Sequence, residues 1–172
     1  MKEIVPKTVM KDYFSQKALN YDEYNSFRKI FAYQYGTICA LHHILGIETG
    51  LQNLIFDMKN GFIQVNSLKF NFEDHKPSPF SLRLSRNIAT FLDKTLLNAG
   101  ILPAFAATVD ALSNDKFSFK KYLIMVHKDL SAAFKSTNSQ ESFVAERLQE
   151  LSSNLDKVRK IIEGAELVAN CG

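Results

Sequence analysis

The sequence of 172 residues is poor in cysteine, proline and glycine and contains no tryptophan. Its two cysteines are Cys39, within a predicted helix, and Cys171, next to the last residue. Neither has the spacing to a histidine that protein metal sites use, so the sequence predicts no metal centre. So few cysteines fit a reducing compartment.

The chain also lacks a strong charge of either sign and a long apolar run. Lys and Arg number 21 against 18 Asp and Glu, and the net charge of +3 is scattered along the chain. This argues against a dedicated nucleic-acid-binding protein. No apolar run reaches the ~20 residues needed to cross a bilayer, and the first residues lack the apolar centre of a secretion signal. We therefore expect an intracellular, soluble protein without a membrane partner.

Apolar residues are abundant, at 46% of the chain, and this predicts one or at most two domains with a real core. Asn20 followed by Glu23 has the spacing of a capping box at the start of a helix. Apolar residues then recur at steps of three and four until Gly46. They are Tyr24, Phe27, Ile30, Phe31, Ile38, Leu41 and Leu45. The pattern predicts a long buried helix, with Phe27, Phe31, Ile38 and Leu45 as its core face.

A β-hairpin is predicted directly after this helix. The runs "NLIFD" and "FIQVN" are joined by "MKNG", in which Asn60-Gly61 allows the positive φ angles of a tight turn. The following residues, 71–81, are charged and contain two prolines but no periodicity, so they predict an ordered loop or lid.

Further helices are predicted after this loop. One runs from Ser85 and ends at Gly100, the next begins at Pro103, and a third covers "SFKKYLIMVHKDLSAAF". Val144, Leu148, Leu151, Leu155, Val158 and Ile162 form an apolar stripe in the last segment, where Asn138 and Glu141 offer a capping box. We interpret this stripe as packed on its own domain rather than as an exposed coiled-coil seam, because it is short for an autonomous zipper.

Four stretches resemble, in order and spacing, the C-terminal lobe of the TRRAP-like pseudokinase branch of the PI 3-kinase-related kinases. They read "VPKTVMKDYF", "FRKIFAYQYGTICALHHILGI", "NGFIQVNSLKFNFE" and "PFSLRLSRNI". The most specific match is the Phe-Arg-Lys step at Phe27 to Lys29 with Gln34-Tyr35 after it. "PFSLRLSRNI" departs from the family pattern by two extra residues. The resemblance implies an α+β, mainly α fold: the C-terminal lobe of a PI3/PI4-kinase-like fold, with a long helix, a β-hairpin and then a helical bundle.

The resemblance also identifies positions where catalytic residues have been replaced. Active members of the superfamily have D-R-H-x-x-N before the hairpin, where this chain reads "ETGLQN". Glu48 stands at the catalytic Asp and Gly50 at the His, and of these residues only Asn53 is retained. Without metal or His support, Glu48 is better explained as a solvated loop carboxylate, and Asn53 as a residue that bonds loop backbone.

The metal-binding D-F-G motif of active members is replaced as well. The same register puts Ser67, Leu68 and Lys69 there, so a neutral hydroxyl stands where Mg²⁺ would need a carboxylate. Asp57 cannot substitute simply, because it lies at the turn end of the first strand. The family's N-terminal lobe, with its Gly-rich loop and Lys, has no counterpart here. We therefore expect a degenerate kinase that is not an enzyme and binds no cofactor or metal.

The resemblance implies two segments and a function. Residues 1–135 would be the pseudokinase lobe, and residues 136–172 a C-terminal helix leading toward a truncated FATC-like segment. The implied function is a nuclear, non-catalytic scaffold that contacts subunits of histone acetyltransferase complexes and transcriptional activators. A divergent active protein or lipid kinase and a stand-alone helical interaction module remain alternatives.

Overall fold

A computed structural model gives the fold. It describes residues 6–45, 47–48, 54–57, 61–66, 69–70, 84–114, 119–133, 140–153, 155–156, 159–160 and 163–164. The helices are α1 (Val9–Lys17), α2 (Tyr21–Leu45), α3 (Arg86–Leu96), the π-helical turn η2 (Leu97–Ile101), α4 (Leu102–Ser113), α5 (Phe119–Ala133) and α6 (Gln140–Ser153). The strands are β1 (Ile47–Glu48), β2 (Leu54–Phe56), β3 (Ile63–Val65) and β4 (Lys69–Phe70). The described part is thus α+β and mainly α, as expected.

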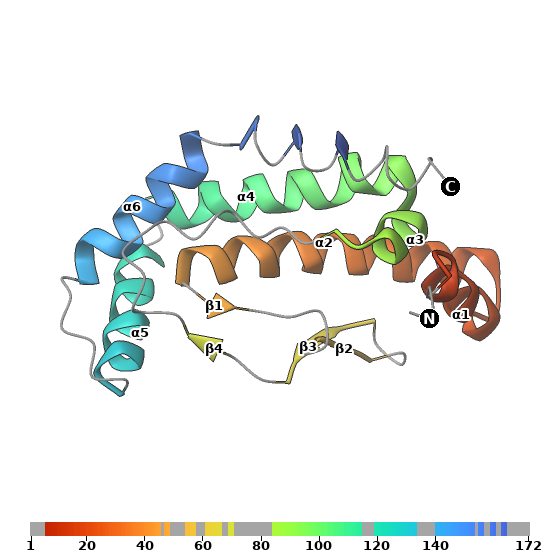
Figure 1. Ribbon diagram of the computed structural model, residues 1–172, viewed down its shortest axis with the longest axis horizontal. Coiled ribbons are helices and arrows are strands. Elements are labelled where there is room, and N and C mark those ends of the chain that lie inside the picture. Colours follow the sequence, from red (N-terminus) through yellow and green to blue (C-terminus); the bar gives the residue numbers. More distant parts are fainter. Residues whose placement is uncertain are drawn as a thin grey trace, which may run out of the picture.

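Helix α2 is the centre of the molecule (Figure 1). Helix α4 runs along one side of it and the strands lie on the other. Helices α1 and α3 gather near its N-terminal end, and α5 and α6 near its C-terminal end. The helices and strands are therefore arranged around α2.

The capping residues predicted for α2 are confirmed. The Asn20 side-chain oxygen accepts a hydrogen bond from the Glu23 N–H at 2.8 Å. The Glu23 carboxylate reaches back to the N–H of Leu19, one residue before the cap. Together these bonds satisfy donors that the first helical turn leaves without partners inside the helix.

The predicted core face of α2 is only partly right. Phe27 and Phe31 are buried, but Ile38 and Leu45 are half-buried and Ile30 is 37% exposed. The buried face includes instead Ala32, Tyr35, Gly36, Ala40 and Ile44. Of these, Ala32 and Gly36 are small and let the neighbouring helical run approach closely.

The predicted helix end at Gly100 is wrong. Helix α3 continues through η2 into α4, and Pro103 stands in the first turn of α4. A Cβ atom on Gly100 would lie 2.7 Å from the Cβ of Ala32, and one on Gly36 would lie 2.6 Å from the carbonyl oxygen of Ile101. Both glycines therefore serve a close approach between α2 and this helical run.

The continuous helical run also differs from the expectation of no membrane-length apolar segment. Arg86–Ser113 is long and apolar enough to cross a bilayer by length and composition. Its largest apolar side chains, Phe91, Leu92, Leu97, Ile101 and Phe105, are fully buried within the core cluster. We interpret the run as the core partner of α2. A buried core helix can be as long and as apolar as a helix that crosses a membrane.

The predicted hairpin is confirmed, with strands of three residues each. Strands β2 and β3 pair antiparallel, with Leu54 opposite Val65, and Gly61 in the connection has the positive φ of 72°. Strands β1 and β4, which were not predicted, pair antiparallel outside them. The predicted loop, residues 71–81, lies outside the described residues.

Helix α6 packs on its own domain, as expected. Val144, Leu148 and Leu151 are buried, and α6 contacts α2, α4 and α5. Val158, Ile162 and Asn138 lie outside the described residues. Helix α1 was not predicted, and its Phe14 side chain joins the core beside Phe56 and Phe91.

Candidate functional site

Two of the positions that the resemblance singled out, Glu48 and Lys69, lie in the β1–β4 pair. Glu48 ends β1, and its Cα partner in the register is Lys69, the first residue of β4. The backbones of these two residues thus lie side by side. Gly50, Asn53 and Ser67 lie outside the described residues, as do the side chains of Glu48 and Lys69.

Asp57 is far along the hairpin from this pair, as predicted. Its N–H donates to the carbonyl of Phe62 and its carbonyl accepts from the N–H of Gly61, both at 2.8 Å. These bonds place Asp57 at the turn. Strand β2 alone separates it by about 10 Å from the region of Glu48, at 3.3 Å per residue. The turn therefore keeps Asp57 apart from the β1–β4 pair.

Gln34 fastens the hairpin to α2. Its side-chain amide donates to the carbonyl of Gly61 at 3.0 Å and accepts from the N–H of Ile63 at 2.8 Å. One side chain thereby satisfies a donor and an acceptor on the same strand edge. The turn end of the hairpin is consequently held on α2.

Arg28 is the second polar anchor of α2, and it ties the helix to a kink in α3. The kink is at Asp93, which has φ 57° and ψ 176° inside an otherwise helical run. Arg28 is buried, and its guanidinium donates to the carbonyls of Phe91 and Leu92, each at 2.7 Å. These carbonyls lose their usual helical partners at the kink, and the Arg28 fork replaces them.

Asp93 completes the arrangement from the other side of the kink. One carboxylate oxygen accepts from the N–H groups of Thr95 and Leu96 at 2.9 and 3.3 Å, as a helix cap does. The other oxygen forms an ion pair with Arg28. A non-glycine residue at this φ and ψ is strained, and these bonds offset the strain.

A third polar cluster joins the C-terminal end of α2 to α6. The buried Nε2 of His43 lies 3.4 Å from a Glu150 oxygen and 3.4 Å from an Arg147 nitrogen. Burial, together with the Arg147 charge, lowers the pKa of His43, while Glu150 acts in the opposite direction. The neutral imidazole is thus favoured in the folded protein.

Among the residues that the structure describes, Cys39 is not an activated thiol and no metal centre is found. Burial raises the pKa of the Cys39 thiol to about 12, so little reactive thiolate forms near neutral pH. Burial also lowers the pKa of His42. Within the described ranges, no three His, Cys, Asp or Glu side chains come together in a way that could hold a metal ion.

Comparison with known proteins gives one clear similarity. The chain is 28% identical over 173 residues to the SAGA complex/NuA4 acetyltransferase complex subunit Tra1 of Schizosaccharomyces pombe. The similarity points to a TRRAP-like region. It covers 95% of this chain but 5% of the relative, so the chain spans a small part of that protein. No family model and no solved structure matches.

The sequence stretches that resemble the TRRAP-like branch include two of the anchors. Arg28 and Gln34 belong to the most specific matching stretch, and in the structure each fastens α2 to another element. Sequence reasoning did not foresee these roles, or the His43 cluster. The sequence did hold a signal for the roles of Arg28 and Gln34. Both lie on a helix that was expected to be buried, and buried polar side chains need partners.

Proposed function

We propose that the chain is a non-catalytic pseudokinase lobe within a TRRAP-like subunit of histone acetyltransferase coactivator complexes. It acts in the nucleus, where it regulates transcription through contacts with complex subunits and transcriptional activators. The fold we assign to it is the C-terminal lobe of a PI3/PI4-kinase-like domain.

The observation that supports this function most is the similarity to the Tra1 subunit along nearly the whole chain. The replaced catalytic positions support its non-catalytic part. Phosphoryl transfer depends on a carboxylate that holds Mg²⁺ and on a base that orients the nucleophile. Ser67 and Glu48 stand at those two positions, and Gly50 stands at the His.

The catalytic positions are replaced, whereas the bonds that hold the helices and the hairpin together are present. This contrast supports a scaffold function. The hairpin is bonded to α2 through Gln34, and the kink in α3 is fully bonded through Arg28. A chain that keeps its framework and loses its catalytic side chains is useful through its binding surfaces.

The test uses the complete parent protein. One variant combines Glu48→Asp, Gly50→His and Ser67→Asp, and a second carries Arg28→Met. We expect the wild type and the first variant to co-purify with acetyltransferase subunits and to lack phosphotransfer activity. We expect the second variant to lose partners because the lobe is destabilised.

Two outcomes would contradict the proposal. Metal-dependent phosphotransfer by the wild-type protein would replace the scaffold with an active kinase. A parent that co-purifies with no acetyltransferase subunit would remove the coactivator role, even if the chain lacks kinase activity.

A further inference from the structure

The kink in α3 replaces two hydrogen bonds of a continuous α-helix. In a regular helix each N–H donates to the carbonyl four residues earlier, so Thr95 would donate to Phe91. Leu96 would likewise donate to Leu92. Instead, the N–H groups of Thr95 and Leu96 donate to one carboxylate oxygen of Asp93, at 2.9 and 3.3 Å. The two donors that follow the kink are thus bound by Asp93.

The two carbonyls that these donors leave are bound by Arg28 of α2. Its Nε donates to the carbonyl of Phe91 and a terminal nitrogen donates to the carbonyl of Leu92, each at 2.7 Å. The same terminal nitrogen forms the ion pair with Asp93. Arg28 therefore holds the acceptors, and Asp93 the donors, of the same two helical bonds.

The backbone at the kink has a conformation that is unfavourable without these side-chain bonds. Among the described residues, Asp93 alone of the non-glycine residues has a positive φ, 57°. A continuous helix would give this residue a φ near about −63°. Conformations of this kind persist where the surrounding contacts enforce them. Removal of the contacts should therefore favour the helical conformation at residue 93.

The two parts of the helical run on either side of the kink are attached to different elements. Behind the kink, η2 is held on α2 by the close approach at Gly36 and Gly100. Before the kink, the Asn87 side chain accepts from the Met10 N–H of α1 at 3.3 Å. Figure 1 shows α1 and α3 together at the N-terminal end of α2. A change at the kink would therefore move the first part of α3 together with α1.

We propose that Arg28 and Asp93 form a latch that holds α3 in its kinked conformation, and that the chain has a second conformation in which α3 is continuous. In the second conformation, the N–H groups of Thr95 and Leu96 bind the carbonyls that Arg28 holds here. The first part of α3 takes a new direction and carries α1 with it, whereas η2 and α4 stay on α2. The Asp93 side chain is half exposed, so the latch is accessible from the solvent.

The packing of the core favours the kinked conformation while the latch is present. The Phe91 and Leu92 side chains are fully buried, and the Phe91 ring contacts the rings of Phe14 and Phe31. A new direction of α3 has to repack these rings, and repacking of a filled core costs stability. Loss of one member of the latch leaves the other in place. The second conformation should therefore dominate only after both are removed.

The test follows hydrogen exchange of the Thr95 and Leu96 amides by NMR in the 172-residue chain. In Asp93→Ala, these amides lose their acceptor while Arg28 still holds the carbonyls, so they should exchange at least about tenfold faster than in the wild type. In Arg28→Met with Asp93→Ala, they can bind the released carbonyls. We expect exchange at least about tenfold slower than in Asp93→Ala, although the double variant lacks more bonds of the latch.

A second measurement on the same samples reports the backbone at the kink. The Cα chemical shift of residue 93 should move to the helical range in the double variant. Asp93→Asn should keep the wild-type backbone, because asparagine tolerates a positive φ and retains an acceptor for the N–H groups. Lys29→Met and Asp110→Ala replace exposed charged residues of α2 and α4 and serve as matched controls. Both should leave the exchange at the kink unchanged.

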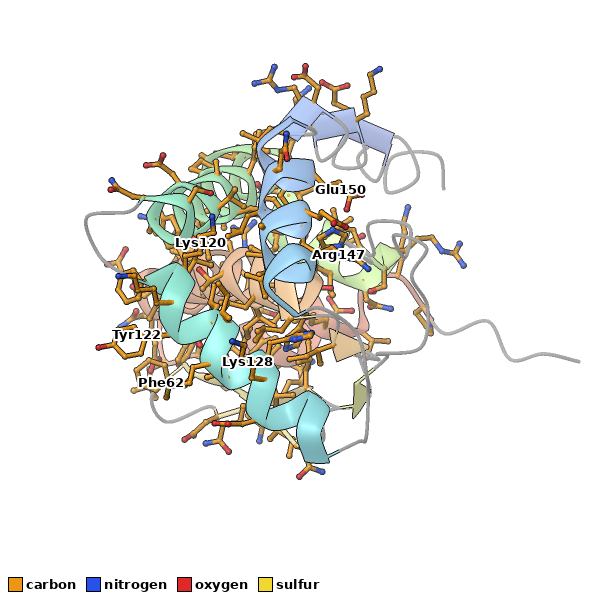
Figure 2. All side chains as sticks on the ribbon, turned by 90° about the vertical axis from the view of Figure 1, so that its left-hand side faces the viewer. Phe62, Lys120, Tyr122, Lys128, Arg147 and Glu150 are labelled. Atoms are coloured by element: carbon orange, nitrogen blue, oxygen red, sulfur yellow. The ribbon has the colours of Figure 1, made fainter. Side chains whose placement is uncertain are left out.

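The other end of the molecule provides an internal control. Figure 2 faces this end, where Tyr122 lies on α5 and Arg147 and Glu150 lie on α6. Both helices pack against α4, which stays in place in the second conformation. Their amide chemical shifts should therefore be the same in the double variant and in the wild type. Shifts that change throughout α5 and α6 would indicate a general loosening of the fold and would contradict the inference.

Three further results would overturn the inference. One is exchange of the Thr95 and Leu96 amides in the double variant that is as fast as in Asp93→Ala. Another is a Cα shift of residue 93 that stays outside the helical range in the double variant. The third is a double variant that does not fold, because the bonds of a continuous helix should replace those that the latch provided.

Discussion

The two ends of α2 each bury a basic side chain against another helix, but they do so with different chemistry. At the N-terminal end, Arg28 is bound by the main-chain carbonyls of Phe91 and Leu92 and by Asp93. At the C-terminal end, His43 contacts the side chains of Arg147 and Glu150. Carbonyls do not titrate and arginine stays protonated, whereas histidine changes charge near neutral pH. Near neutral pH the first contact should therefore change little, whereas the second should respond to pH.

Of the changes that test this comparison, removal of the Arg28 side chain should have the largest effect on stability. In Arg28→Met, the carbonyls at the kink lose their donor inside the core, and we expect the free energy of unfolding to fall by about 3 kcal/mol. The Asp93 side chain is half exposed, so solvent weakens the contribution of the ion pair itself to stability. Urea unfolding measures the change.

Arg28→Lys sharpens this prediction. An ammonium is a point charge and cannot span the acceptors as a guanidinium fork does, so an intermediate loss is expected. If Arg28→Met unfolded at the same urea concentration as the wild type, the role of Arg28 at the kink would be refuted.

The middle of α2, which packs against η2 and α4, gives the next largest effect. In Gly100→Ala, the new methyl group would lie 2.7 Å from the Cβ of Ala32, and α2 and η2 would have to separate. We expect a loss of about 1–3 kcal/mol from this overpacking. The thermal midpoint measures it.

Gly164→Ala is the matched control, because its added methyl group would meet no atom within 4 Å. Alanine in an exposed helical position should leave stability unchanged or raise it by up to about 1 kcal/mol. Equal effects of the two substitutions would show that the close approach at Gly100 does not matter.

Acid should weaken the C-terminal contact, with a smaller effect than either substitution. Because the pKa of His43 is lowered below its ordinary value of 6.5, the unfolded chain takes up a proton more readily than the folded chain. Its contribution to stability is complete above pH 6.5 and is lost as the pH falls toward the lowered pKa. The free energy of unfolding, measured from about pH 7 to about pH 5, should fall less in His43→Gln than in the wild type.

The neighbours of His43 should change this acid sensitivity in opposite directions. Arg147 lowers the pKa of His43 and Glu150 raises it. Glu150→Gln should therefore extend the loss of stability to lower pH, and Arg147→Gln should reduce it. The same pH dependence in both variants would show that these charges do not act on His43.

The sequence predicted the elements whose signals are local. The capping box at Asn20 and Glu23, the turn at Gly61 and the stripe from Val144 to Leu151 depend on neighbouring residues, and all three were confirmed. Helix α1 escaped prediction because its pattern is weak, and β1 and β4 because two-residue strands have no periodicity to detect.

Features that depend on distant residues could not be predicted. Gly100 was interpreted as a helix end because glycine commonly stops helices, yet here it makes room for Ala32. The kink at Asp93 depends on Arg28, which is 65 residues away in sequence. For the candidate site, Asp57 lies at the turn as predicted, whereas the roles proposed for Glu48, Gly50, Asn53 and Ser67 stay predictions.

The polar bonds of α2 also suggest an order in which the chain is assembled during synthesis. Gln34 finds its partners 27 and 29 residues later, Arg28 63 and 64 residues later, and His43 104 and 107 residues later. A chain emerging from the ribosome would secure the hairpin first, then the kinked helix, and the C-terminal end of α2 last. During that interval, we expect this end of α2 to be the part of the nascent chain most accessible to chaperones.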